Sequence, residues 1–154
     1  MRALIVRSRA TLIALLAVTA AASATAGSVS TATAAPPAPV SIQATVTQED
    51  FSGVWQASGA LSDSGTFART DAHLTGSVLN SPTVGAVQAT FLVSGSQGTF
   101  TLRDELVASS DGVNGNWQVV SGTGAYEGMS GHGTSSFDFS SSTVNFTGVI
   151  SKAG

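Results

Sequence analysis

Short runs in which apolar and polar side chains alternate make up most of the chain after residue 40, and they constrain its fold more than any other feature. Successive side chains of a β-strand point to opposite faces, so such a run presents one apolar face to a core. Glycine, serine, asparagine and aspartate separate the runs, and no segment sustains the 3.6-residue period of a capped helix. The pattern predicts an all-β domain.

The alternating runs amount to roughly eight strands. They lie at residues 41–47, 51–59, 66–74, 87–93 and 100–108, around Trp117 and Val119, at Phe137 and Phe139, and at 144–150. Several short strands with turn-rich links are typical of a sandwich or a closed barrel. Only 10% of the residues are charged, which leaves few charges to protect exposed strand edges. We favour a single antiparallel barrel, because closure removes those edges.

The first 35 residues predict export through the general secretion route. A head with Arg2, Arg7 and Arg9 precedes an uncharged apolar run at 10–22, and A-x-A cleavage signatures follow at 22–24, 24–26 and 32–34. The apolar run is shorter than the roughly 18 residues that a membrane anchor needs. We therefore expect a signal peptide cleaved between about residues 24 and 35. A Pro-rich spacer at 36–39 and a barrel domain at 40–154 would follow, in a secreted protein without a stable membrane anchor.

The charge of the exported part argues against two classes of partner. After residue 35 the chain carries three cations against nine acids, a formal net charge of −6 with histidine neutral. Nucleic acids and anionic membranes attract clustered cations, and three scattered ones form no basic patch. We expect neither nucleic acid nor a membrane surface as a partner, and a homo-oligomer stays open. The chain has no cysteine, so the core must hold the domain without disulfides.

Residues 117–134 hold five glycines within twelve residues. The spacing is G-x-G-x-x-x-G, which is not the dinucleotide fingerprint, and no long helix follows to bind a phosphate. Glycines that permit positive φ would instead let the chain turn around Tyr126 and Met129, which would plug one end of the core. The members of this structural turn are Gly122, Gly124, Tyr126, Gly128, Gly131 and Gly133.

The same segment reads W-x-V-V-x-G-T-G-A-Y-x-G-M-x-G-x-G, and it resembles the signature turn of the allene oxide cyclase and dirigent-type β-barrels. Gly98–Leu102 and Gly115–Trp117 are also similar to secreted bacterial members of that superfamily, whose function is unknown. The resemblance implies an eight-stranded antiparallel barrel of the calycin type with a central cavity. It carries over no activity, because the catalytic residues of the plant enzymes lie outside the glycine turn and match no position here.

Catalytic and metal-binding patterns are sparse. The Ser130-Gly131-His132 segment lacks the G-x-S-x-G elbow of a serine hydrolase. The two histidines, His73 and His132, show no metal-ligand spacing. Asp104 and Glu105 are adjacent, so on a strand they point to opposite faces and cannot act as a carboxylate pair. We expect no metal and no cofactor.

Charged side chains gather on one predicted strand, at 66–74. Phe67, Arg69, Asp71 and His73 would share one face of it. If that face points inward, its charged residues line a cavity together with Asp104, which lies between Leu102 and Leu106 on an apolar face. The catalytic candidates are then Asp104, His73, Arg69 and Asp71. The alternative turns Ala68, Thr70, Ala72 and Leu74 to the core and leaves the charged set in water, where charged residues usually lie. An inward Asp104 could also serve only to protect a strand edge.

Three functions remain open on these observations. The leading one is a non-enzymatic barrel that binds a small, partly apolar ligand in its cavity, since barrels of this size either fill with side chains or hold one small ligand. The candidate wall residues are Trp55, Phe67, Phe91, Phe100, Leu102 and Trp117. The second is a cyclase or isomerase, as the resemblance implies. The third is a structural or protein-binding surface domain, which would have a filled barrel and an exposed apolar patch.

Overall fold

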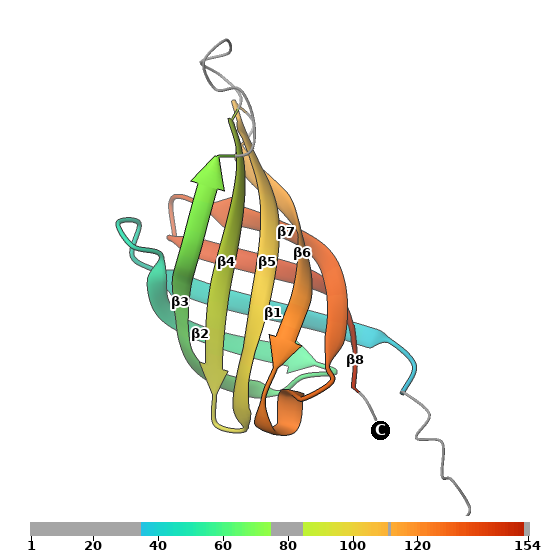
Figure 1. Cartoon of the computed structure of the whole chain (residues 1–154). Helices are drawn as coiled ribbons and strands as arrows, with labels where there is room; N and C mark the ends of the chain where they lie inside the picture. Colours follow the sequence, from blue (N-terminus) through green and yellow to red (C-terminus); the bar gives the residue numbers. More distant parts are fainter. Residues whose placement is uncertain (1–34, 75–84, 111, 153–154) are drawn as a thin grey trace, which may run out of the picture. The chain divides into compact units, whose positions relative to one another are not determined.

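Eight antiparallel strands form a closed barrel in the computed structural model, which describes residues 35–74, 85–110 and 112–152 (Figure 1). Each strand pairs with the next along the chain, and β8 pairs with β1 to close the ring. The prediction of an all-β, eight-stranded antiparallel barrel is confirmed. The elements are β1 (Ala38–Val46), β2 (Ser52–Gly59), β3 (Asp63–Leu74), β4 (Gly85–Gly95), β5 (Gly98–Ser109), β6 (Gly112–Gly122), the 3₁₀ helix η2 (Gly124–Tyr126), β7 (Ser130–Asp138) and β8 (Thr143–Ser151).

The barrel begins slightly before the expected domain boundary at residue 40. Ala38 and Pro39, expected in the spacer, belong to β1 and pair with Ile150 and Val149 of β8. The Ala35 N–H donates to the Lys152 carbonyl at 3.2 Å, which continues the same pairing. Apart from Ala35, the predicted signal peptide lies outside the described residues. Within the described ranges, no helix is long and apolar enough to cross a membrane.

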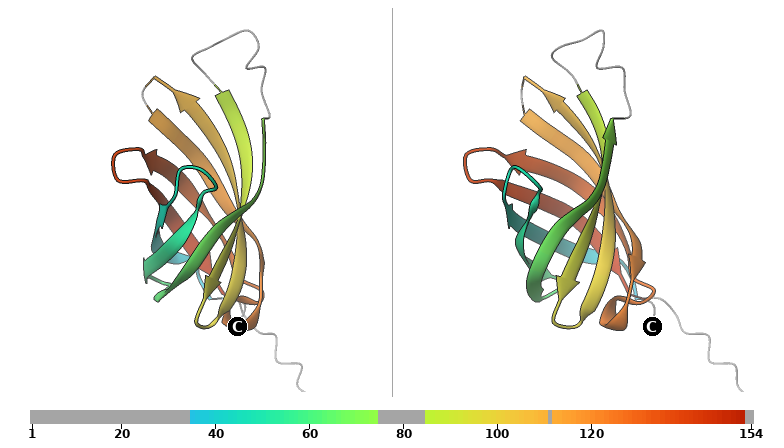
Figure 2. Two further views of the ribbon diagram at one scale, coloured as in Figure 1. Left: turned by 90° about the vertical axis from the view of Figure 1, so that its left-hand side faces the viewer. Right: turned by 60° about the vertical axis from the view of Figure 1, so that its left-hand side comes forward.

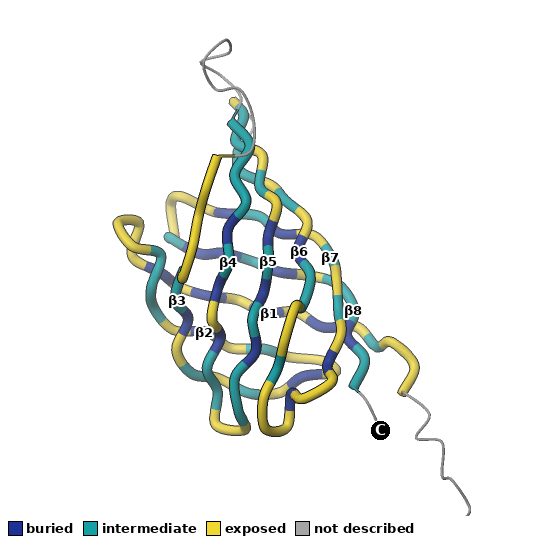
Figure 3. The backbone as a smooth tube through the Cα atoms, in the orientation of Figure 1, coloured by how far each residue is buried: buried dark blue, intermediate teal, exposed yellow. Residues whose placement is uncertain are grey.

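Alternation between inward and outward side chains is plainest on β1. Val40, Ile42, Ala44 and Val46 are buried, and the residues between them are exposed, as the alternating colours of the tube show (Figure 3). A buried residue of one strand faces the interior beside the inward residues of its neighbours, so all eight strands contribute to one core. The period-2 pattern of the sequence is the direct cause of this arrangement.

One end of the barrel carries the β4–β5 turn and η2 (Figure 1). Buried side chains fill this end. The Trp55 and Phe100 rings lie 5.5 Å apart between centroids, and Phe100 contacts Tyr126 at 5.1 Å. Their polar atoms have partners, because the Tyr126 hydroxyl donates to Asp63 and the Trp55 Nε1–H donates to the Ser94 carbonyl at 3.0 Å. Large rings with paired polar atoms make this end a closed core.

The glycine segment forms the turn that places Tyr126 at this end. Gly124 has φ of +61°, a left-handed conformation that favours glycine. At Gly122 a Cβ would lie 2.0 Å from the Tyr126 carbonyl oxygen, so no larger residue fits there. Tyr126 and Met129 are both buried against the closed core.

Strand β3 changes face at its midpoint. Arg69 pairs with Phe91 and Asp71 pairs with Thr90, so Thr70 is an extra residue in the ladder, a β-bulge. Before the bulge, Phe67 points inward and is buried. Beyond it the inward face passes to Ala72, which lines the interior. The expected single charged face of residues 66–74 is therefore split, since one extra residue reverses every later side chain.

Candidate functional site

The end of the barrel opposite η2 is hollow. There β4, β5 and β6 extend past the β1–β2 and β7–β8 turns (Figure 2). A cavity of about 240 Å³ lies among their inward residues. Its wall is apolar except for two side chains, and it comprises Phe51, Arg69, Ala72, Val87, Ala89, Phe91, Asp104, Leu106, Ala108, Val113, Phe137, Phe139 and Val144.

An aromatic layer forms the floor of the cavity and lies between the two ends of the barrel. Phe91 lines the cavity and stacks on Phe67 with centroids 4.8 Å apart. Phe146 meets Phe91 edge-on at 6.2 Å and Trp117 at 6.3 Å. The Trp117 Nε1–H donates to the Thr147 carbonyl at 3.2 Å. This layer separates the hollow end from the filled one.

Asp104 is the buried polar group of the cavity wall. Its side chain is 0% exposed, and the Ser135 hydroxyl donates to its Oδ1 at 2.8 Å. Its other carboxylate oxygen, Oδ2, has no hydrogen-bond partner among the described residues. Gly115 of β6 makes room for this pair, because a Cβ there would lie 2.8 Å from Asp104 Oδ1 and 2.7 Å from Ser135 Oγ.

Burial raises the pKa of Asp104 to about 6 from an ordinary value of 3.8. Hydrogen bonds from Ser135 and from the Glu105 backbone favour the ionised form, and the negative charge of Glu105 opposes it slightly. Desolvation outweighs them because a carboxylate loses its hydration in an apolar cavity. Near neutral pH, Asp104 is therefore a largely ionised acceptor that can also take up a proton.

Arg69 and three phenylalanines form the mouth of the cavity. The Arg69 guanidinium lies over the Phe51 ring at 4.8 Å, and the backbone N–H of Arg69 donates to the Phe51 carbonyl at 3.1 Å. Phe51 contacts Phe137 at 5.4 Å, and Phe137 meets Phe139 edge-on at 4.7 Å. Phe139 is 57% exposed although it lines the cavity, so the cavity opens to solvent here.

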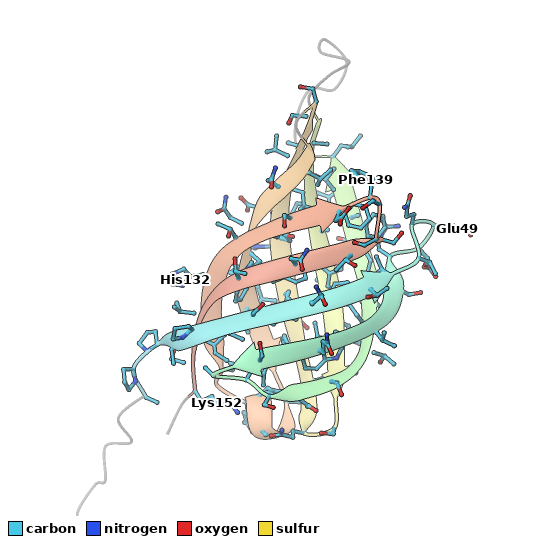
Figure 4. All side chains as sticks on the ribbon, turned by 180° about the vertical axis from the view of Figure 1, so that it is seen from behind. Glu49, His132, Phe139 and Lys152 are labelled. Carbon is cyan, nitrogen blue, oxygen red and sulfur yellow. The ribbon has the colours of Figure 1, made fainter. Side chains whose placement is uncertain are left out.

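The two turns at the mouth hold each other in place. Figure 4 shows Glu49 on the β1–β2 turn and Phe139 on the β7–β8 turn side by side, away from His132 and Lys152. The Gln48 side-chain amide donates to the Phe139 carbonyl at 3.2 Å. Phe51 has φ of 54°, an uncommon conformation for a bulky residue, which the hydrogen bond from Arg69 helps to hold.

The catalytic candidates separate into two groups. Arg69 and Asp104 line the same cavity. Asp71 and His73 do not, because the bulge at Thr70 turns them outward, where both are exposed and Asp71 Oδ2 lies 3.4 Å from His73 Nδ1. The expectation that all three charged residues of the strand share one face is wrong for this reason. No group of three metal-ligating side chains occurs in the described part of the chain.

The candidate wall residues also separate. Phe91 lines the cavity, whereas the other five are buried without lining it. Trp55 and Phe100 belong to the filled end, and Phe67 and Trp117 to the aromatic layer. The remaining member, Leu102, is fully buried one inward position below Asp104 on β5.

Several site residues were missed from the sequence. Ser135 is one of many serines, and nothing in its local pattern marks it as the partner of Asp104. Phe139 was assigned to a strand, but it follows the end of β7 at Asp138. Among the cavity residues that were not proposed as part of the site, Ala89, Leu106 and Ala108 have a recognisable signal, because they continue the apolar faces of their strands.

Comparison with known families gives a match over most of the chain. The model of a family described as "Protein of unknown function (DUF3224)" matches residues 32–147, which include every residue of the cavity wall. Searches of the curated proteins and of the solved structures gave no match.

Proposed function

Since the chain belongs to the DUF3224 family, whose description assigns no function, we propose one from the cavity itself: the barrel binds one small, largely apolar molecule in its hollow end. The observation that carries this proposal is the contrast between the two ends. One end is packed with aromatic rings, whereas the other keeps about 240 Å³ free above Phe91. An engineered apolar cavity of roughly 150 Å³ binds benzene, so the hollow suits a molecule with a one- or two-ring body.

The site of action belongs to the proposal as well. The N-terminal pattern of basic head, apolar run and A-x-A signatures supports export of the barrel. We expect the mature protein to bind its ligand outside the cytoplasm, and N-terminal sequencing of the protein from culture medium would test this. Retention of residues 1–24 on an intracellular protein would contradict it.

Binding can be tested directly with a probe. 1-Methylnaphthalene, titrated by calorimetry and by ligand-observed NMR, should bind the protein with one site per chain. Ala89→Leu should weaken this binding at least about tenfold, because the added carbons would occupy the cavity beside Phe91. Ala68→Leu makes the same change on β3, outside the cavity wall, and should leave binding intact. Solvent extraction of the natural protein followed by mass spectrometry would identify the ligand.

Two results would contradict binding as the function. The first is the absence of both probe binding and a co-purifying molecule. The second is equal binding by wild type and by both cavity-filling variants, Ala89→Leu and Ala108→Leu.

A cyclase or isomerase of the allene oxide cyclase and dirigent type is the second candidate. Asp104 favours it, because a carboxyl with a pKa of about 6 in an apolar cavity suits proton transfer near neutral pH. The position of His73 on the outer surface removes one of the groups that such chemistry was expected to use. Once a ligand is known, Asp104→Asn should abolish its turnover without unfolding the protein.

A purely structural or protein-binding domain has less support. Such a domain would have a filled barrel and an exposed apolar patch, whereas one end of this barrel is hollow. Among the described residues, the large exposed apolar side chains come from five different strands and the β7–β8 turn: Val54, Leu74, Leu92, Val107, Val120 and Phe139.

A further inference from the structure

Asp104 lines a mostly apolar cavity, and its Oδ2 is an unused hydrogen-bond acceptor. The Asp104 side chain is fully buried, its Oδ1 accepts from Ser135 at 2.8 Å, and its Oδ2 has no partner among the described residues. Buried polar atoms in folded proteins nearly always have a hydrogen-bond partner, so an orphan atom on a side chain that lines a cavity indicates a donor that enters through that cavity.

The structural explanation for an inward carboxylate does not apply here. Inward charges protect exposed strand edges, but β5 has no edge, since it pairs with β4 along one side and β6 along the other. Asp104 itself lies between Ala89 and Trp117 in these ladders. The carboxylate therefore has no role in guarding the sheet, and Gly115 keeps space open for it at the expense of a side chain on β6.

Arg69 does not neutralise Asp104. Both line the cavity, but no ion pair within 4.0 Å joins them, and the guanidinium lies over the Phe51 ring instead. The described lining residues thus offer a ligand one buried anion and one cation near the mouth. A cationic ligand would be attracted by Asp104, but it would lose its hydration in a mostly apolar cavity that also holds Arg69, and an anionic ligand would be repelled by the Asp104 carboxylate. A neutral hydrogen-bond donor avoids both costs.

We propose that the cavity selects a small apolar alcohol or phenol, whose hydroxyl donates to Asp104 Oδ2 while its body packs on Phe91 and the aliphatic wall. This inference rests on the proposed binding function and names the class of ligand. The ligand hydroxyl gives Oδ2 a hydrogen-bond donor, as the Ser135 hydroxyl does for Oδ1. The aromatic mouth then covers the apolar body.

A matched probe series tests the inference on the wild-type protein. The probes share a naphthalene body and differ at one substituent: 1-methylnaphthalene, 1-naphthalenemethanol, 1-naphthylmethylamine and 1-naphthoic acid. The alcohol should bind at least about tenfold more tightly than the methyl compound, because hydrogen bonds to a charged group are among the stronger ones. The amine and the acid should bind more weakly than the alcohol. This comparison needs no variant and so does not depend on the folding of one.

Two variants test whether Asp104 is the source of the preference for the alcohol. Asp104→Leu should lose the tenfold preference for the alcohol over the methyl compound. Glu105→Leu makes the same replacement on the exposed face of the same strand and should keep the preference. Circular dichroism would verify that both variants are folded.

The outcomes separate the two proposals. Binding of the methyl compound without preference for the alcohol would overturn the ligand class and leave the binding function standing. So would tightest binding of the amine or the acid, or a preference that survives in Asp104→Leu. Failure of every probe to bind would overturn the binding function, and the ligand class with it.

Discussion

Replacing the buried carboxyl should change the pH dependence of stability by a predictable amount. Asp104 has a pKa of about 6 in the folded barrel and an ordinary value of 3.8 when exposed. The difference is about two units at about 1.4 kcal/mol per unit, so keeping the ionised carboxylate buried costs about 3 kcal/mol. Asp104→Asn has nearly the same size and cannot ionise, and it should remove this cost.

The direction of this pH dependence follows from how tightly the folded and unfolded chains bind the Asp104 proton. Between pH 4 and pH 6 the folded protein holds the Asp104 proton more tightly than the unfolded chain does, so the free energy of unfolding falls as the pH rises. The full penalty applies above the folded pKa of about 6. Relative to wild type, Asp104→Asn should therefore gain about 2 kcal/mol between pH 4 and pH 7. Other titrating groups affect both proteins equally and cancel in the comparison.

Urea unfolding at pH 4, 5, 6 and 7 measures this difference. Glu105→Gln removes a charge from the exposed side of the same strand and is the control, whose difference from wild type should stay within about 0.5 kcal/mol. If the difference in unfolding free energy between Asp104→Asn and wild type does not change with pH, the reasoning is refuted, because the carboxyl would then not be desolvated. A difference of the opposite sign would mean that a cation pairs with Asp104 in solution.

Three further substitutions test the parts around the cavity. Gly115→Ala places a methyl group against the cavity carboxyl and its hydroxyl donor, and should cost about 1–3 kcal/mol of unfolding free energy in urea. Tyr126→Phe removes the hydrogen bond to Asp63, whose pKa that bond depresses, and should cost about 1–2 kcal/mol at pH 7 and less as the pH falls toward the depressed pKa. Phe139→Ala should weaken calorimetric binding of 1-methylnaphthalene several-fold with little loss of stability, whereas Val54→Ala, an exposed site outside the cavity wall, should leave it unchanged.

The fold was predictable because it depends on a repeated local rule. Alternation of apolar and polar side chains determines which face of each strand is buried, as β1 illustrates, and few charges favour closure over exposed edges. The boundaries were less predictable. Ala38 and Pro39 look like spacer by composition, yet the pairing partners that make them a strand lie on β8, more than a hundred residues away.

The site was harder to predict because it depends on exceptions to that rule. Nothing in the sequence of residues 66–74 marks Thr70 as a bulge, and the bulge alone decides that Arg69 faces the cavity while Asp71 and His73 face solvent. Of the two orientations predicted for this strand, the one with Phe67 and Arg69 inward is correct before the bulge, and the one with Ala72 inward is correct after it. Asp104 was recoverable, since it interrupts an apolar face, but Ser135 was not, because its partner lies on a strand that is not adjacent.

The hollow itself follows from the sizes of the inward side chains. Between the floor at Phe91 and the aromatic mouth, five inward positions of β3 to β6 hold only alanine or valine (Ala72, Val87, Ala89, Ala108 and Val113), whereas aromatic rings pack against one another at the filled end. Side chains this small cannot fill a barrel wide enough for tryptophan. At about 24 cal/mol per Å³, an empty apolar hollow of about 240 Å³ would cost up to about 6 kcal/mol, less where solvent enters. Exchanging two of these alanines for leucine would fill part of the hollow and recover part of that stability. If the hollow is kept for its function, Ala89→Leu and Ala108→Leu should therefore stabilise the protein while they abolish binding.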